Sequence, residues 1–328
     1  MKLEALWYRP CRWLWLLSPL SLLFWLITAL RRQAYRLGWM PRYRAPVPVI
    51  VVGNLSVGGN GKTPVVIWLV ETLRAAGWQP GVVSRGYGGK AAVYPLLLTA
   101  ETPAAECGDE PRLIADRCGV PVAVAPKRAE AVQALLATGQ VDLIICDDGL
   151  QHYALARDLE LVVVDGERRF GNGHLLPMGP LREGLWRLGQ VDAALCNGGA
   201  AQPGEYSMTL LAQTVQPLLP QESGLPTHTQ VDAMAGIGHP PRFFNTLRQL
   251  GYDLQQTVAF ADHQSFDAKA LAKQFSDRPL LMTEKDAVKC REFAQANWWY
   301  LPVAAQLPHS LAEFIVHTLK GVKHGTGS

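Results

Sequence analysis

The sequence is poor in charge and in cysteine. Only 18% of its 328 residues are charged and 48% are hydrophobic, which excludes a largely disordered chain, because such chains bury too little apolar surface to offset the entropy of ordering. The length excludes a small scaffold stapled by disulfides. No internal repeat and no low-complexity tract occurs. No Cys-x-x-Cys pair is present, so we expect reduced thiols at Cys11, Cys107, Cys118, Cys146, Cys196 and Cys290.

Excess positive charge is confined to one end of the chain. Residues 1–44 contain eight Lys or Arg against Glu4 alone, a net +7, whereas the remainder contains 23 basic and 27 acidic side chains, a net −4. A protein that binds nucleic acid normally spreads its basic surface over the folded domain. We therefore expect no nucleic-acid partner, and expect contact with an anionic membrane surface instead.

Residues 13–30 form a run of 18 residues without a charge. As a helix this run would extend ~27 Å, close to one hydrocarbon thickness. Arginines flank both ends, so the charge rule leaves the orientation open. A buried core helix and a cleaved signal peptide are the alternatives, but Ala29-Leu-Arg-Arg-Gln33 is unlike a cleavage site. We expect residues 1–40 to form a membrane anchor helix, which spans the bilayer or, kinked at Pro19, lies along the interface.

The rest of the chain alternates strand-like and helix-like segments, which is typical of an α/β fold with a parallel sheet, and its length predicts two domains. Apolar strands are expected at 47–52, 81–85, 142–147, 159–165 and 191–197, and helices at 64–76 and 127–137. A Pro- and Gly-containing segment marks a boundary. The expected division is a first domain over 41–215, a linker over 216–230, a smaller α/β domain over 231–320 with strands at 231–235, 256–260, 280–283 and 298–303, and a frayed tail over 321–328.

The first strand leads into a glycine-rich loop, Gly53-Asn-Leu-Ser-Val-Gly-Gly-Asn-Gly-Lys-Thr63, and then into a helix. This context is the one that a phosphate-binding P-loop requires, because backbone amides converge on phosphate oxygens at a helix N-terminus. Ser56 stands where the consensus has glycine. We expect a P-loop NTPase-like domain whose nucleotide contacts are Ser56, Val57, Gly58, Gly59, Asn60, Gly61, Lys62 and Thr63, with Lys62 on the β and γ phosphates and the Thr63 hydroxyl on Mg²⁺.

A second strand-end supplies carboxylates. Leu143-Ile-Ile-Cys-Asp147 is an apolar strand ending in acid, and Asp148 follows it. Asp147, Asp148 or both are candidate Mg²⁺ ligands, with Asp147 preferred; the alternative is two solvated aspartates in a turn.

Further short motifs accompany the phosphate loop along the chain. They are Ser84-Arg-Gly-Tyr-Gly-Gly89, Gly108-Asp-Glu-Pro111, Asp147-Asp-Gly-Leu-Gln-His152, Pro177-Met-Gly-Pro-Leu-Arg-Glu183, Ala235-Gly-Ile-Gly238, Phe260-Ala-Asp-His263 and Thr283-Glu-Lys-Asp-Ala-Val-Lys289. In this order, the motifs resemble those of the tetraacyldisaccharide 4′-kinases of lipid A biosynthesis, over essentially the whole chain. The resemblance implies transfer of the ATP γ-phosphoryl group to the 4′-hydroxyl of an acylated glucosamine disaccharide 1-phosphate, at the cytoplasmic face of the inner membrane.

The resemblance also implies roles for individual residues. Asp109 matches the family's acidic base and His263 its assisting histidine, which predicts a dyad in a cleft between the domains; by themselves the two residues read as a helix cap and a polar loop residue. Candidates for contact with substrate or phosphate are Arg85, Gln151, His152 and Arg182, each with a structural alternative. Residues 283–286 are expected either to contact nucleotide or to brace the cleft.

Two other functions use the same loop, namely a membrane-associated nucleotide switch and a partitioning ATPase. Guanine-specific switches carry Asn-Lys-x-Asp, whereas the nearest string here is Thr283-Glu-Lys-Asp286. Nothing in the sequence indicates a protein partner.

Overall fold

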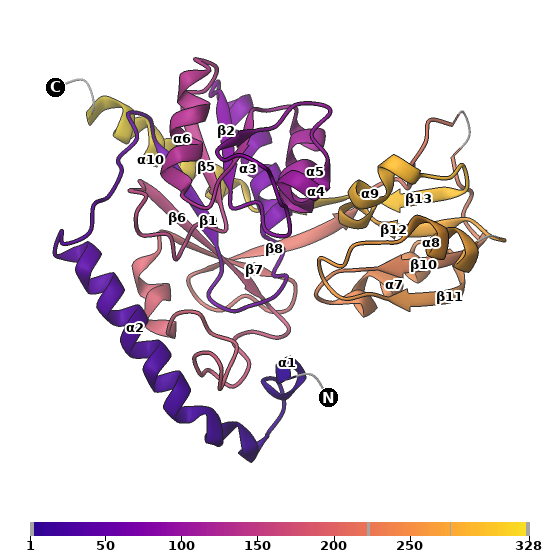
Figure 1. The fold of residues 1–328 in the computed structure, drawn as a ribbon, viewed down its shortest axis with the longest axis horizontal. Coiled ribbons are helices and arrows are strands. Elements are labelled where there is room, and N and C mark those ends of the chain that lie inside the picture. The colour runs from indigo at the N-terminus through magenta and orange to yellow at the C-terminus, as the bar shows by residue number, and fades with distance from the viewer. Residues whose placement is uncertain (1–2, 222–223, 276, 326–328) are drawn as a thin grey trace.

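The computed structural model describes residues 3–221, 224–275 and 277–325, which form two lobes and a long N-terminal helix (Figure 1). Within these residues the larger lobe is built on a nine-stranded sheet in the order β14-β8-β7-β6-β1-β5-β2-β4-β3, parallel except for β14 and β3. This agrees with the predicted α/β class. The strands are β1 Val49–Gly53, β2 Pro80–Ser84, β3 Leu96–Leu97, β4 Val122–Val124, β5 Leu143–Asp147, β6 Leu159–Asp165, β7 Ala193–Asn197, β8 Glu205–Ala212 and β14 Val303–Gln306.

Helices cover both faces of this sheet. Successive side chains of a strand point to opposite faces, so Ile50 and Val52 join one core while Val49 and Val51 join the other. The first core contains buried residues of α3 and α10, and the second contains those of α6. The helices of the lobe are α3 Lys62–Ala75, α4 Ala104–Cys107, α5 Asp109–Cys118, α6 Arg128–Ala137 and α10 His309–Gly325, with the 3₁₀ helix η2 Leu185–Gln190.

The smaller lobe has its own sheet, in the order β11-β10-β12-β13-β9. Apolar side chains pack on both of its faces in two further cores. Its strands are β9 Gln216–Pro217, β10 Gln230–Ala235, β11 Asp253–Ala259, β12 Leu280–Thr283 and β13 Trp298–Leu301, and its helices are α7 Pro240–Gln249, α8 Ala268–Gln274 and α9 Glu284–Cys290, with η3 Arg291–Phe293.

The structure differs from the expected division at the C-terminal end. The segment 298–303, expected as one strand, contains two: β13 lies in the small sheet, and after Pro302 the chain enters β14, which pairs antiparallel with β8 of the large sheet. Helix α10 follows and buries Leu311, Ile315 and Leu319 in the first core. Residues 303–319 therefore pack with the larger lobe. The helix also continues through 321–325, where a frayed tail was expected; residues 326–328 lie outside the description.

The expected linker also contains structure, because β9 at its start pairs antiparallel with β13. The small sheet thus begins at Gln216, before the expected boundary.

The N-terminal segment consists of α1 Leu3–Leu6, the 3₁₀ helix η1 Arg12–Leu17 and α2 Ser18–Arg36. Pro19 lies in the first turn of α2, where proline is tolerated, so the change of helix type precedes it and no kink interrupts α2. Residues 12–36 are long and apolar enough to cross a membrane, by length and composition only, and few of them are buried. Helix α2 runs along the outside of the larger lobe (Figure 1).

Candidate active site

The glycine-rich loop connects β1 directly to α3. Gly58 and Gly61 have φ values of 106° and 93°, a backbone region that favours glycine, and Gly61 caps the first turn of α3. Lys62 and Thr63 then open the helix. The loop amides thus surround a helix N-terminus, which is the geometry that binds phosphate.

Ser56 has a specific task inside this loop. Its hydroxyl accepts a hydrogen bond from the Asn60 side-chain amide at 3.0 Å, and both residues are buried. The second N–H of that amide lies 3.4 Å from the Val163 carbonyl. The residue that departs from the consensus therefore holds the loop together. Val57 differs from expectation, because its amide donates to the Pro180 carbonyl at 2.9 Å and its side chain packs with the N-terminal segment.

Polar residues at and just after the C-terminal ends of β6 and β7 donate hydrogen bonds to the phosphate loop. The Asn197 amide donates to the Asn60 carbonyl at 3.0 Å. Arg168 donates to the Gly59 carbonyl at 2.8 Å and pairs with Asp165 at 2.8 Å. The sequence predicted both strands, at 159–165 and 191–197, but did not single out these side chains. No sequence pattern predicted a role for Arg168, because this residue lies in an irregular turn after β6.

Asp148 lies beside the loop lysine. Its carboxylate is 3.6 Å from Lys62 Nζ and accepts from Arg182 at 3.1 Å. Burial raises the pKa of Asp148, but the charges of Lys62 and Arg182 outweigh it and the net shift is downward. Asp148 is therefore an ionised group that positions two cations. Arg182, a candidate for contact with substrate or phosphate, forms a carboxylate pair, which was its structural alternative.

Asp147 fits a metal ligand better. It is fully buried at the end of β5, its Oδ2 accepts a 3.4 Å hydrogen bond from Ser84, and its Oδ1 has no hydrogen-bond partner. Burial, with the carboxylates of Glu110 and Asp148 nearby, raises its pKa. A buried carboxylate oxygen without a partner is the kind of group that a cation satisfies. Among the described residues no group of three or more His, Cys, Asp or Glu forms a ready-made metal site, so phosphate oxygens would have to complete the coordination.

The other candidate site residues that follow β5 are Gln151 and His152, and their surroundings indicate structural roles. The Gln151 amide donates to the Asn54 carbonyl and to Glu183, each at 3.1 Å, so it braces the phosphate loop. Burial and the surrounding arginines, Arg128 first and Arg85 among them, lower the pKa of His152 to about 4, which keeps the imidazole neutral at physiological pH. Arg85 itself is exposed.

Asp109 and His263 meet across the two lobes. Asp109 is the first residue of α5 and is buried, and its Oδ1 lies 3.1 Å from His263 Nδ1. Lys285 and Lys289 of α9 lie 3.9 and 3.7 Å from its other oxygen. Burial raises the pKa of Asp109, but the hydrogen bond from His263 and these two charges overcome that effect and bring it to about 2.

Lys285 connects this pair to further acids. Its Nζ lies 3.0 Å from both Glu110 and Asp262, and 3.2 Å from His263 Nε2. Burial lowers the pKa of Lys285, but the neighbouring carboxylates, Glu110 first, raise it overall, so the ammonium stays charged. The sequence motif that contains it is held in place by Thr283, whose side chain caps α9 at the Asp286 amide. This motif thus contacts the larger lobe through Lys285 and Lys289, while residues 283–285 also line the pocket between the lobes.

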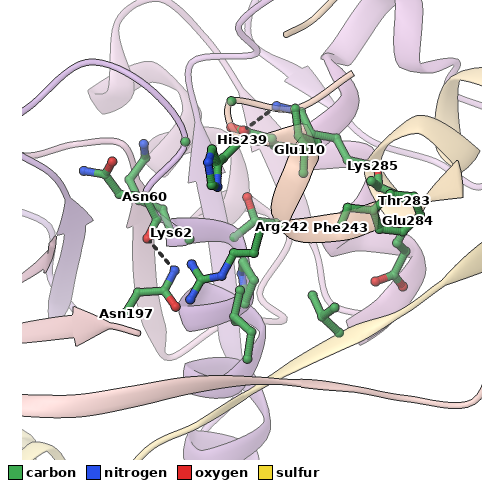
Figure 2. A pocket seen from close by; sticks show the side chains of 18 of the residues that line it. Asn60, Lys62, Glu110, Asn197, His239, Arg242, Phe243, Thr283, Glu284 and Lys285 are labelled. Carbon is green, nitrogen blue, oxygen red and sulfur yellow. Dashed lines mark hydrogen bonds and ion pairs between the residues drawn. The ribbon is translucent and has the colours of Figure 1, made fainter. Parts of the chain in front are cut away.

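A pocket of about 250 Å³ opens between the lobes, over the phosphate loop (Figure 2). Arg242 of α7 points into it towards Asn197 and Lys62, and no carboxylate partner of its guanidinium occurs in the described part of the chain. Sequence reasoning missed Arg242, because it lies within an ordinary amphipathic helix. Polar lining comes from residues 59–63, Glu110, Asp165, His239, Asp262 and 283–285, and apolar lining from Ile67, Leu113, Leu210, Ile237, Phe243 and Leu301.

Strand, glycine loop, lysine and strand-end carboxylates define a P-loop nucleotide-binding protein in which a second lobe covers the phosphate site. The profile of the tetraacyldisaccharide-1-P 4′-kinase family matches residues 13–320. The chain belongs to this family.

Relatives match over nearly the full length. The tetraacyldisaccharide 4′-kinase of Aeromonas hydrophila is 61% identical over 327 residues, which cover 99% of this chain and 98% of the relative. That of Vibrio campbellii is 55% identical over 333 residues, covering 99% and 98%. A crystal structure of LpxK from Aquifex aeolicus in complex with ATP has a TM-score of 0.76 and 27% identity, covering 92% of this chain and 98% of the other.

Proposed function

We propose that this chain transfers the γ-phosphoryl group of ATP to the 4′-hydroxyl of a tetraacyldisaccharide 1-phosphate. Family membership supports the substrate class. The observation that carries the proposal is the contact of Asp109 with His263 at 3.1 Å, because their sequence neighbours Glu110 and Asp262 line the same pocket as Lys62. A proton acceptor thus lies at the edge of a phosphate site.

In this mechanism the substrate hydroxyl oxygen forms a bond to the γ-phosphorus while the bond to the β–γ bridging oxygen breaks, and ADP leaves. The hydroxyl proton passes to Asp109, which is ionised at neutral pH because its pKa is about 2. His263 orients the carboxylate. Lys62, Arg242 and the loop amides stabilise charge on the transferred group, and electrostatic stabilisation of this kind supplies most of the catalysis in phosphoryl transfer.

Mg²⁺ fits the residues present. Asp147, with its unpartnered Oδ1, and the Thr63 hydroxyl would hold it, while Asp148 is already engaged with Lys62 and Arg182. When bound, the ion neutralises charge on the β and γ phosphate oxygens. We rank Asp147 above Asp148 as the ligand for this reason.

The location that we propose is the inner membrane, with the active site on its cytoplasmic face. The exposed apolar surface of α2 supports membrane association. An acylated substrate keeps its chains in the bilayer, so an enzyme held there avoids extracting them at about 0.8 kcal/mol per CH₂.

The test is incubation of detergent-solubilised protein with labelled ATP, Mg²⁺ and tetraacyldisaccharide 1-phosphate. We expect label in the lipid, and Lys62→Ala should abolish it. Label in free phosphate alone would favour a nucleotide switch or a partitioning ATPase and would overturn the proposal.

A further inference from the structure

A second pocket, of about 330 Å³, lies at the C-terminal end of α2, away from the cleft between the lobes. Its lining is dominated by one residue type. Tyr153, Glu160 and Gln190 contribute to it, together with six arginines: Arg32, Arg36, Arg42, Arg44, Arg157 and Arg187.

The positive charge of this arginine pocket is only partly compensated. Glu160, the one carboxylate in its lining, is shared by Arg157 at 2.8 Å and Arg187 at 2.5 Å. Arg44 pairs with Asp158 outside the lining. Within the described residues, no carboxylate pairs with the remaining three, which are Arg32, Arg36 and Arg42.

Two of these uncompensated arginines are held by aromatic rings. Arg32 lies over Trp186 with 4.0 Å to the ring centroid, and Arg42 lies 5.9 Å from that of Tyr35. Cation–π contact orients a guanidinium without neutralising it. The charges are therefore fixed in place and remain available to an anion.

Arg187 is itself buried and compensated. It is 5% exposed, and two carboxylates hold its guanidinium, Glu160 at 2.5 Å and Glu183 at 3.9 Å from its Nε. The charge available to a ligand therefore comes from Arg32, Arg36 and Arg42. A planar guanidinium donates two parallel hydrogen bonds to two oxygens of a tetrahedral phosphate, and several guanidinium groups can share its oxygens.

The position of the pocket relative to the apolar part of α2 suits a lipid phosphate. Arg32 and Arg36 belong to the last turns of α2, and the apolar residues Ile27 and Leu30 just before them are exposed. If α2 is embedded, the arginines fall at the headgroup level. This step rests on the membrane location proposed above.

We propose that the arginine pocket binds the phosphate of a membrane lipid. That phosphate comes either from an anionic phospholipid or from the 1-position of the substrate itself. The pocket is linked to the catalytic edge, because Tyr153 lies five residues after Asp148 and donates to Glu183, which also accepts from Gln151.

The first experiment measures binding of the full chain to phosphatidylcholine vesicles with and without phosphatidylglycerol. The variant is Arg36→Gln/Arg42→Gln, and its matched control is Arg9→Gln/Arg12→Gln, which removes equal charge before the apolar run. For a phospholipid ligand, the pocket variant should weaken binding to the anionic vesicles by about tenfold and the control by much less. Circular dichroism and thermal unfolding check that both variants fold.

The second experiment identifies a substrate phosphate by kinetics in neutral-detergent micelles without phospholipid. For this source, the pocket variant should raise KM for the lipid about tenfold while kcat and KM for ATP stay unchanged. Vesicle binding equal to that of the control, together with an unchanged KM, would overturn the proposal. Should the wild-type chain fail to phosphorylate the lipid, the vesicle measurement still decides on the pocket, so the two failures are distinguishable.

Discussion

At the scale of single residues, a departure from a consensus marks a specific contact. Ser56 replaces a glycine of the P-loop pattern, and its hydroxyl pairs with the Asn60 amide at 3.0 Å in a buried position. The loop therefore depends on an internal side-chain hydrogen bond that a loop with glycine at this position would lack.

Replacing Ser56 with alanine tests this contact. Ser56→Ala leaves one N–H of Asn60 buried without a partner, and we expect a loss of about 1–3 kcal/mol in the free energy of unfolding. Urea denaturation without nucleotide measures it. Ser207, on β8, is exposed, and Ser207→Ala is a control expected to change little. Equal stabilities of the two variants would contradict the role of Ser56.

The Asp109–His263 pair makes a prediction about turnover. Asp109→Asn and His263→Gln should each lower kcat by about 10²–10⁴-fold, because proton transfer is impaired, while nucleotide binding remains mostly intact. Steady-state kinetics and equilibrium binding of a labelled nucleotide separate the two effects. Near-normal kcat in both single variants would remove the assignment.

The same pair fixes a pH dependence of stability. The folded pKa of Asp109, about 2, lies below its ordinary value of 3.8, so the folded state binds fewer protons between these values. Its contribution to stability is present above pH 3.8 and is lost as the pH falls towards 2. Asp109→Asn should therefore flatten the acid side of the stability profile only below about pH 4, as thermal unfolding across pH would show.

At the scale of elements, α2 is attached to the larger lobe by few contacts. Ser21 donates to the Leu175 carbonyl at 3.1 Å and accepts from the Met178 amide at 2.9 Å, while many apolar side chains of the helix remain exposed. Its exposed surface is better explained by an apolar environment than by packing within the chain.

Deleting residues 1–36 should consequently impair use of the lipid substrate more than the fold. We expect nucleotide binding to persist and lipid phosphorylation in membranes to fall at least tenfold, because the substrate stays in the bilayer. Sedimentation with membranes and transfer of labelled phosphate are the measurements. A truncated chain that is fully active in membranes would contradict this positioning role.

At the scale of the whole molecule, the site exists only where the lobes meet. Arg117 of α5 pairs with Glu284 of α9 at 2.7 Å, with side chains 18% and 12% exposed, and Lys285 continues the contact to Glu110. Burial raises the pKa of Glu284 despite Arg117, so this carboxylate depends on its partner.

Arg117→Ala should therefore loosen the cleft. We expect a loss of about 1–3 kcal/mol of stability and a higher KM for ATP, because the pocket is lined from both lobes. The control is Arg291→Ala, which breaks the more exposed cross-lobe pair with Asp116 and should cost less than about 1 kcal/mol. Equal effects of the two substitutions on KM would count against the closure argument.

The sequence by itself determined the local elements and the phosphate loop. Residues 159–165 form the strand expected of them, and the loop between Gly53 and Thr63 leads into a helix, because apolar runs and glycine positions act over a few residues. The family motifs, rather than spacing or composition, selected Asp109 and His263. Only the tertiary structure brought these two residues together, placed Arg242 over the phosphate site and gathered arginines at the end of α2. It alone showed that β14 pairs within the nine-stranded sheet and that α10 packs in the first core. The reason is that strand partners are chosen by long-range burial, which no local pattern encodes.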